Sequence, residues 1–579
     1  MLTSRCALLC AVSAFAGLTA CGGDSGSVSA PPIAAPPIAI PPPPAVLPPV
    51  NLPPRLTDTE VQVSTDTPFT LGCLSGGGTV YRNAEVEPQV AINPRNPDNI
   101  VITWQQDRWS NGGSSGIVTA ASTDGGSTWT RAAFPVSRCG GGNAGNGGDY
   151  GRATDPWVTF GPTGIVYQMA LAFEGTMFST GSASAVMAAR STDGGRTWSA
   201  ATPLIVSDKA SFNDKNSITA DPTDPNFAYA TWDRLASGGG GPSLMARTTD
   251  GGLSWEAARV IYDPGTQSQT IGNQILVLPN GTLVNVFTQI DPGPNNSEVA
   301  TIRLIRSTDR GGSWSAPIIV SGLTAIGASD PTTQVPIRDG SIVASVTIAP
   351  NGTLWAAWQD ARFSNGTIDG IVLARSVDGG LTWSTPVQVN SVRNVAAFTP
   401  TVRLRADGTL AVMYYDLRSD TTDRATLPTE LILARSADAV NWTETRVTDS
   451  FDLDTAPQAS GAYFLGDYQG LEAQGNVFVP VYVRTTGNPQ DRTDVFMLQA
   501  RSIAAAAPPV RYTAAAGASS TANPCGPAPA RTSSARWSAA FPAGRAGARR
   551  RPSRAEHSRA RRPFSAAAAT ARPSCGGSG

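Results

Sequence analysis

Asp and Arg side chains recur at the ends of apolar segments in this chain. Asp233-Arg234 directly follows a Trp-containing apolar run, and Asp360-Ala-Arg362 follows another such run after one Gln. Carboxylates can transfer protons, planar guanidinium groups grip carboxylates, and neighbouring aromatic rings can stack on sugar faces. A set of such groups gathered at one end of a sheet assembly favours a carbohydrate site.

Two groups of residues are candidates for that site. The catalytic candidates interrupt the simple Asp–Arg pattern, and they are Asp155, Asp214, Lys215, Asp467 and Tyr468. The substrate-binding candidates are Asp107, Arg108, Asp233, Arg234, Arg338, Asp360, Arg362, Tyr415, Arg418 and Arg484. The alternative interpretation is that each Asp–Arg pair is an ion pair that braces its own loop, and the pattern alone leaves both open.

The composition excludes several chemistries. The only His is His557, near the C-terminus, so His-dependent triads and His-ligated zinc are not expected in the folded part. No spacing resembles an EF-hand loop, so calcium is permitted by the carboxylates but not indicated. We expect neither a metal nor a cofactor.

The candidates are positioned by a repeated unit. One segment reads Ser376-Val-Asp-Gly-Gly-Leu-Thr-Trp383, and related copies end at Trp129, Trp198, Trp255, Trp314 and, in a worn form, Trp442. In each unit the Asp can accept backbone N–H bonds in a tight turn, and glycine supplies the positive φ that such turns require. The Trp can fill the gap between neighbouring sheets. Repetition at roughly 57–69 residues predicts stacked units of β-hairpins.

These segments resemble the Asp box, or bacterial neuraminidase repeat, of sialidase-like β-propellers. The resemblance implies an all-β propeller of four-stranded antiparallel blades, with the repeated turn between the third and fourth strands. First strands are predicted near Glu87, Asp155, Lys215, Asn273, Ile342, Thr399 and Asp467, which favours seven blades, with the six of familiar sialidases as the alternative. Glu60–Ser64 is expected to supply the last strand and close the ring.

The same topology predicts where a ligand binds. The repeated turns lie at one end of the blades, and the candidate residues lie at the opposite end. In similar sialidases three Arg clamp the substrate carboxylate, an Asp acts as acid and base, and a Tyr is the nucleophile. The early Arg-Ile-Pro motif of those enzymes is absent, since the first strand reads Glu87-Pro-Gln-Val-Ala-Ile-Asn-Pro94. By position, Arg338, Arg418 and Arg484 could form the clamp, with Tyr468 or Tyr415 as nucleophile.

The domain organisation follows from composition. Residues 1–20 resemble a lipoprotein signal peptide, and Leu18-Thr-Ala-Cys21 resembles a lipobox, which implies lipidation of Cys21 and export to the outer membrane or cell surface. A Pro-rich linker (21–58), the propeller (59–504) and an Ala/Arg/Pro-rich tail (505–579) follow. Residues 511–579 contain twelve Arg and one acid, Glu556, yet we expect no nucleic-acid partner for an exported chain.

Cys73 and Cys139 are the cysteines of the predicted folded region, and the sequence leaves a disulfide and two free thiols both open. We expect a monomer that meets the membrane only through its lipid. The leading function hypothesis is a sialidase-like glycoside hydrolase that acts on glycans. The alternatives are a non-catalytic glycan- or protein-binding propeller and a polysaccharide lyase, in which Lys215 would serve as the base.

Overall fold

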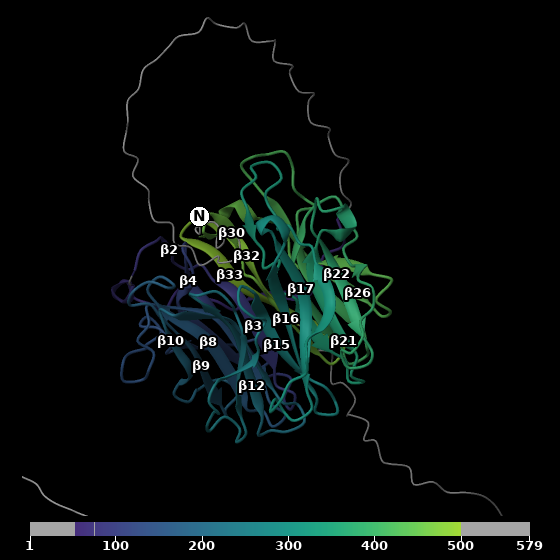
Figure 1. Ribbon diagram of the computed structural model, residues 1–579. Coiled ribbons are helices and arrows are strands. Elements are labelled where there is room, and N and C mark those ends of the chain that lie inside the picture. Colours follow the sequence, from purple (N-terminus) through teal and green to yellow (C-terminus); the bar gives the residue numbers. More distant parts are fainter. Residues whose placement is uncertain (1–51, 75, 500–579) are drawn as a thin grey trace, which may run out of the picture. The chain divides into compact units, whose positions relative to one another are not determined.

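The computed structural model describes residues 52–74 and 76–499, which lie within one compact unit (Figure 1). The described part is all-β, as predicted. Its helices are four short 3-10 turns: η1 (Leu71–Cys73), η2 (Pro294–Asn296), η3 (Arg362–Ser364) and η4 (Leu453–Thr455). None of the described helices has the length and apolar character needed to cross a membrane. The predicted signal peptide, the lipidated Cys21, most of the linker and the Arg-rich tail lie outside the described residues.

Most strands belong to antiparallel meanders of four, which follow one another along the chain. The first three meanders are β3 (Val86–Ile92), β4 (Ile100–Trp109), β5 (Ser114–Ser122), β6 (Thr130–Phe134); β7 (Arg152–Phe160), β8 (Val166–Glu174), β9 (Ala183–Ser191), β10 (Thr202–Asp208); and β11 (Ser211–Ala220), β12 (Ala228–Ala236), β13 (Ser243–Thr248), β14 (Arg259–Tyr262). The next three are β15 (Gln269–Val277), β16 (Leu283–Pro292), β17 (Glu298–Ser307), β18 (Ile318–Leu323); β20 (Ser345–Ile348), β21 (Leu354–Asp360), β22 (Gly370–Ser376), β23 (Val387–Gln388); and β24 (Ala397–Leu404), β25 (Leu410–Asp416), β26 (Pro428–Ser436), β27 (Thr443–Arg446).

A further four-stranded sheet joins the two ends of the described chain. It contains β31 (Gly470–Gln474), β32 (Val477–Asn488), β33 (Asp491–Gln499) and the N-terminal strand β1 (Thr59–Gln62). β1 pairs antiparallel with β33, from Thr59 opposite Gln499 to Gln62 opposite Phe496. The predicted closure by the N-terminal strand is therefore confirmed, with bounds one to two residues earlier than Glu60–Ser64.

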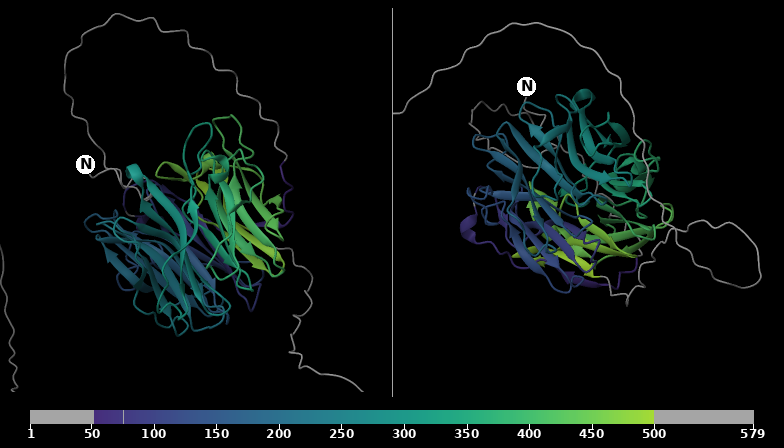
Figure 2. Two further views of the ribbon diagram at one scale, coloured as in Figure 1. Left: turned by 45° about the vertical axis from the view of Figure 1, so that its right-hand side comes forward. Right: turned by 90° about the horizontal axis from the view of Figure 1, so that it is seen from below.

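The first strands of the meanders line a cavity inside the unit, and Figure 1 labels two of them, β3 and β15, near the middle of the view; Figure 2 gives two further views of the same unit. Contacts run in order through β3, β7, β11, β15, β20, β24 and β31, and then back to β3. The sheets thus form a closed ring of the β-propeller kind, which covers sheet edges that would otherwise pair with other chains. The predicted starts near Ile342 and Asp467 fall three residues early, because β20 begins at Ser345 and β31 at Gly470.

The repeated turns connect the third and fourth strands of their meanders, as predicted. In the turn after β22, Asp378 Oδ1 accepts the backbone N–H groups of Leu381 and Thr382, both at 3.0 Å, and the Ser376 hydroxyl at 2.7 Å. Gly379 and Gly380 have φ values of +73° and +92°, which L side chains rarely adopt. Trp383 packs against an apolar cluster drawn from two neighbouring sheets. Turn chemistry and inter-sheet packing therefore explain the repeat.

Extra segments are inserted between the meanders. β19 (Ile337–Arg338), β29 (Gln458–Ala459) and β30 (Ala462–Phe464) form a small sheet in which β19 runs parallel to β30. Two further short strands, β2 (Val80–Tyr81) and β28 (Phe451–Asp452), pair with β4 and β26. Cys73 and Cys139 form a disulfide with a Cα–Cα distance of 5.0 Å, so the disulfide alternative is the one adopted.

Candidate functional site

Several inner strands carry a bulge near their first residues. At each bulge the strand register shifts and one residue adopts a left-handed conformation: Glu87 (φ 54°), Asp155 (φ 51°), Lys215 (φ 43°), Gly272 (φ 70°) and Thr399 (φ 51°). Positive φ is unfavourable for residues other than glycine, and such strain often accompanies binding or catalytic sites. The bulges therefore mark one end of the inner strands, where Glu87, Asp155 and Lys215 come from consecutive sheets.

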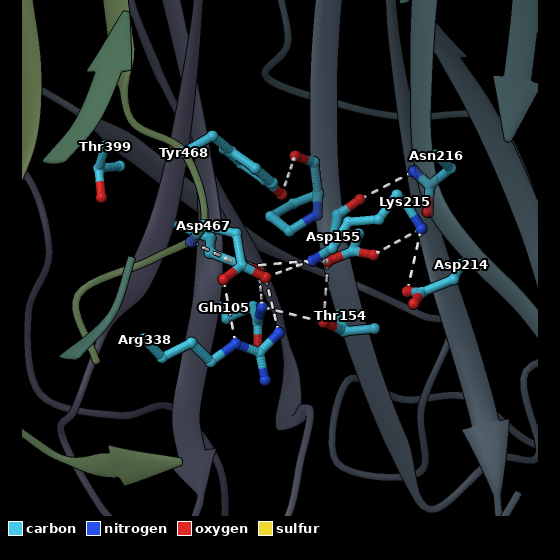
Figure 3. A network of polar contacts seen from close by, with 12 residues as sticks. Gln105, Thr154, Asp155, Asp214, Lys215, Asn216, Arg338, Thr399, Asp467 and Tyr468 are labelled. Atoms are coloured by element: carbon cyan, nitrogen blue, oxygen red, sulfur yellow. Dashed lines mark hydrogen bonds and ion pairs between the residues drawn. The ribbon is translucent and has the colours of Figure 1, made fainter. Parts of the chain in front are cut away.

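Lys215 lies at the centre of a buried group of charges (Figure 3). Its Nζ is 2.5 Å from Asp467 Oδ2, 3.6 Å from Asp155 Oδ1 and 3.9 Å from Glu87 Oε1. Its backbone N–H donates to Asp155 Oδ2 at 3.1 Å and to Asp214 Oδ1 at 3.0 Å. We call Glu87, Asp155, Asp214, Lys215, Arg338 and Asp467 the Lys215 cluster. The four ionisable candidates Asp155, Asp214, Lys215 and Asp467 are thus brought together.

Arg338 completes the cluster from the inserted strand β19. Its Nε donates to Asp467 Oδ1 at 3.0 Å and its Nη2 to Oδ2 at 2.6 Å. Its guanidinium also lies over the Phe464 ring, 4.7 Å from the centroid, and Arg108 lies 4.4 Å from the same ring. The Asp467 carboxylate is therefore bound by two cations, and Phe464 of β30 packs against both guanidinium groups.

The acids of the cluster differ in protonation. Burial raises the pKa of Glu87 to about 8, although the nearby Lys215 ammonium lowers it. Burial likewise raises the pKa of Asp214 to about 7. Burial acts in the same direction on Asp467, but Arg338 and Lys215 outweigh it and hold the pKa of Asp467 well below its ordinary value. A protonated carboxyl and an ionised carboxylate thus lie side by side near neutral pH, and the Asp467 backbone N–H donates to Glu87 Oε1 at 3.1 Å.

Lys215 is a poor candidate for the base of a lyase, and Tyr468 is a poor candidate for the nucleophile of a sialidase. Burial lowers the pKa of Lys215, but the Asp155, Asp467 and Glu87 carboxylates raise it to a value above the ordinary one, so Lys215 stays an ammonium and is no base for a lyase. Burial and the nearby carboxylates raise the pKa of Tyr468 well above 10. Its hydroxyl donates to the Pro156 carbonyl at 3.2 Å. A neutral phenol held in this way is a weak nucleophile.

A central cavity of about 460 Å³ runs along the inner strands. Asp467 and Tyr468 line one end of it, together with Trp157, whose ring centroid is 5.3 Å from that of Tyr468. Exposed Pro94 and Arg95, in the turn after β3, line the other end. This volume lies within the range of small-molecule sites.

One end of the cavity lies at the end of the ring that carries the repeated turns, where exposed Pro94 and Arg95 line it. The turn after β3 and the repeated turn after β5 are joined, because the Gly125 backbone N–H donates to the Asp98 carbonyl at 2.9 Å. At the other end the inserted segments pack over the cluster, where Gly340 lies against the main chain of Asp467. The sequence predicted the ligand mouth at the end opposite the repeated turns. That end holds the Lys215 cluster and one end of the cavity, and the position of the ligand mouth stays a prediction. Insertions far apart in the chain cover that end.

Two predicted Asp–Arg pairs brace their own loops. Asp360 Oδ2 is 2.7 Å from Arg362 Nη2 and Asp416 Oδ2 is 2.6 Å from Arg418 Nη2, with both carboxylates buried. This is the alternative that the sequence left open for such pairs. Asp233 does not form such a pair with Arg234. Its carboxylate is buried and lies near the Gly272 backbone N–H, and burial raises its pKa. Arg234 forms no ion pair with any residue that the structure describes.

Other binding candidates are engaged elsewhere. Asp107 accepts the backbone N–H of Asn83 at 2.9 Å and the Thr67 hydroxyl at 2.9 Å, and thus holds the N-terminal loop. The Tyr415 hydroxyl donates to the Val483 carbonyl at 2.6 Å, and Arg484 Nε donates to Glu60 Oε1 at 2.7 Å. The three Arg proposed as a clamp therefore do not converge. Arg338, Arg418 and Arg484 each bind a different carboxylate.

Sequence reasoning missed Glu87 and Trp157. A usable signal was present, because Glu87, Asp155 and Thr399 each precede a proline and each lies within the first four residues of an inner strand. A proline restricts the residue before it, so a repeated X-Pro step can mark a repeated backbone distortion. Arg108 was predicted and lies beside the cluster, where burial lowers its pKa to about 10.

Comparison with known proteins finds likenesses only among solved structures. No protein-family model matches the chain. No curated protein matches it either. A Hadza microbial sialidase is 14% identical with a TM-score of 0.41, covering 77% of this chain and 98% of its own. An α-L-arabinanase from Penicillium chrysogenum is 14% identical with a TM-score of 0.40, and the match covers 62% of this chain and 93% of the arabinanase. A Dyadobacter fermentans protein of unknown function is 15% identical with a TM-score of 0.40, and the match covers 73% of this chain and 97% of that protein. Likeness at this level carries no argument about activity.

Proposed function

We propose that the ring is a seven-bladed, sialidase-like β-propeller that binds the end of a glycan in its central cavity. The blade number is supported by the circuit of inner strands β3, β7, β11, β15, β20, β24 and β31. Each of these strands begins a four-stranded meander.

The observation that carries the proposal lies at the inner end of the cavity. Trp157 and Tyr468 form an aromatic pair there, and both line the cavity. Gln469 also lines it and is 2% exposed, yet its Oε1 has no hydrogen-bond partner within residues 52–74 and 76–499. A buried acceptor without a partner costs free energy, which a ligand hydroxyl would recover. Aromatic rings beside a free amide oxygen match the two requirements of a sugar, which are an apolar face to stack on and hydroxyl groups to bind.

Binding fits this geometry better than sialidase chemistry does. Of the guanidinium groups proposed as a clamp, Arg338 is bound to Asp467, Arg418 to Asp416 and Arg484 to Glu60. Tyr468 holds its proton tightly.

A glycan array tests the binding proposal. The full chain is expected to retain a defined set of glycans, and Trp157→Ala is expected to lose it at unchanged circular dichroism. Phe363→Ala is the matched control, since Phe363 is an exposed aromatic residue outside the cavity lining. Retention of the same glycans by Trp157→Ala, or no retention by the wild type, would rule out the cavity as the site.

The second candidate function is glycoside hydrolysis of sialidase type. It is favoured by the opposite pKa shifts of Glu87 and Asp467, which suit a general acid and an ionised partner. The test is release of a fluorescent leaving group from a panel of aryl glycosides that includes a sialoside. Turnover that Asp467→Asn abolishes would support hydrolysis, and absence of turnover across the panel would leave glycan binding alone.

We also propose that the protein is exported and anchored through a lipid on Cys21, at the outer membrane or cell surface, as a monomer. The support is the Leu18-Thr-Ala-Cys21 segment that follows an apolar run. Labelling with a fatty-acid analogue should mark the wild type and not Cys21→Ser. Equal labelling of the two would contradict the anchor.

A further inference from the structure

Three carboxylates meet where the first and last sheets of the ring join. One oxygen from each of Glu85, Asp491 and Asp494 lies within 4.8 Å of the other two. Glu85 directly precedes β3, and Asp491 and Asp494 belong to β33. Glu85 is fully buried and Asp494 is 5% exposed, so water screens this group of acids poorly.

The protein balances the charge of this group only in part: burial raises the pKa of Asp494 overall, and Arg484, opposite Asp494 in the strand pair, lowers it. Within residues 52–74 and 76–499, no Lys or Arg forms an ion pair with any of the three carboxylates. The Gln106 side-chain amide donates to Glu85 Oε1, but Glu85 Oε2 is buried and has no hydrogen-bond partner among the residues that the structure describes. Burial and the neighbouring Asp494 raise the pKa of both Glu85 and Asp491, the latter to about 6. Buried like charges of this kind need either a proton or a cation.

We propose that Glu85, Asp491 and Asp494 bind a hard divalent cation, best matched by Ca²⁺. The donors are carboxylate oxygens, and no His or Cys takes part, which disfavours zinc and other transition metals. Ca²⁺ accepts six to eight oxygens in flexible geometry, so Asp491, which is partly exposed, leaves room for water to complete the shell. The sequence, which has no recognisable calcium loop, predicts no metal here, because the three ligands are brought together only when the ring closes.

The position of the site gives the cation a structural task. Asp494 Oδ1 accepts the Gln62 amide at 2.8 Å and the Ser64 hydroxyl at 2.6 Å. The Glu85 backbone N–H donates to the Thr493 carbonyl at 3.1 Å. A bound cation would therefore link the N-terminal segment, β3 and β33, and would stabilise the closed ring over the unfolded chain.

The experiment is calorimetric titration of CaCl₂ into the chelator-treated full chain, with thermal unfolding in parallel. We expect one Ca²⁺ per chain and a Tm that rises by about 3 °C at a Ca²⁺ concentration roughly 100-fold above Kd. Asp491→Asn should weaken binding at least about tenfold, because it removes one charge from a carboxylate that makes no side-chain hydrogen bond in the part of the chain that the structure describes. Asp263→Asn removes an exposed carboxylate outside the group and should bind Ca²⁺ as the wild type does.

Two outcomes would overturn the proposal. Equal Ca²⁺ affinity of the wild type and Asp491→Asn would place any bound ion elsewhere. Absence of Ca²⁺ binding by the wild type, with a Tm that depends on pH and not on Ca²⁺, would mean that a proton shared by Glu85 and Asp494 balances the group. If Asp491→Asn fails to fold, the wild-type titration still tests whether Ca²⁺ binds, and Asp491→Ser, which also removes the carboxylate, takes its place in the affinity comparison.

Discussion

At the scale of the residue, the Lys215 cluster makes the free energy of unfolding depend on pH. Glu87 keeps its proton up to a pKa of about 8 in the folded chain, whereas its ordinary value is 4.5. Between these values the unfolded state binds fewer protons than the folded state. The free energy of unfolding must therefore fall as the pH rises through this interval.

We predict that wild-type stability in urea decreases from about pH 5 to about pH 8, by up to about 1.4 kcal/mol per pH unit for each proton concerned. Glu87→Gln should flatten this slope, because the amide cannot ionise. Glu174→Gln alters an acid that is more than a third exposed and paired with Arg138, and should leave the slope unchanged. An identical slope in wild type and Glu87→Gln would show that Glu87 does not carry the effect.

The sequence identified much of this cluster and misassigned the rest. Asp155, Asp214, Lys215 and Asp467 stood out because they interrupt the Asp–Arg pattern near the predicted starts of inner strands, and both features are local in sequence. The partner of Arg418 was also readable locally, as the loop-bracing alternative, but the partner of Arg484 was not. Asp416 lies two residues from Arg418, but Glu60 lies 424 residues from Arg484 and becomes its neighbour only through ring closure.

At the scale of the element, the repeated turns hold the third and fourth strands together. Asp378 accepts two backbone N–H groups and the hydroxyls of Ser376 and Thr382 within one turn. Such turns were predictable because all of their donors and acceptors lie within a few residues of sequence. The inserted sheet was not, because β19 and β30 are separated by more than a hundred residues and neither carries a repeat.

We predict that Asp378→Ala lowers the free energy of unfolding by about 1–2 kcal/mol, since several backbone N–H groups lose their acceptor. Asp378→Asn keeps one side-chain oxygen and should lose less. Urea denaturation measures both variants. An alanine variant as stable as the wild type would mean that the glycines and Trp383 alone maintain the turn.

At the scale of the whole molecule, β1 closes the ring from the N-terminal side. It covers β33, and Val63 just beyond it is fully buried. Without β1, β33 would present an open edge to other chains.

We predict that deletion of residues 52–64 destabilises the unit by about 4 kcal/mol, from lost strand hydrogen bonds and lost apolar burial, and promotes association. Size-exclusion chromatography with light scattering should detect the aggregates. A peptide of residues 55–66 added in trans should restore the monomer by pairing with β33. A deletion variant that stays monomeric and stable would contradict closure by β1.

The central claim is that a glycan is bound inside the ring, between the Trp157–Tyr468 pair and the end that carries the repeated turns. A crystal structure of the protein soaked with the glycan that the array selects tests this most directly. We predict electron density for a sugar ring stacked near Trp157, with a hydroxyl donating to Gln469 Oε1. Density at the opposite end against Arg338 and Asp214, or on an outer face of the sheets, would contradict it.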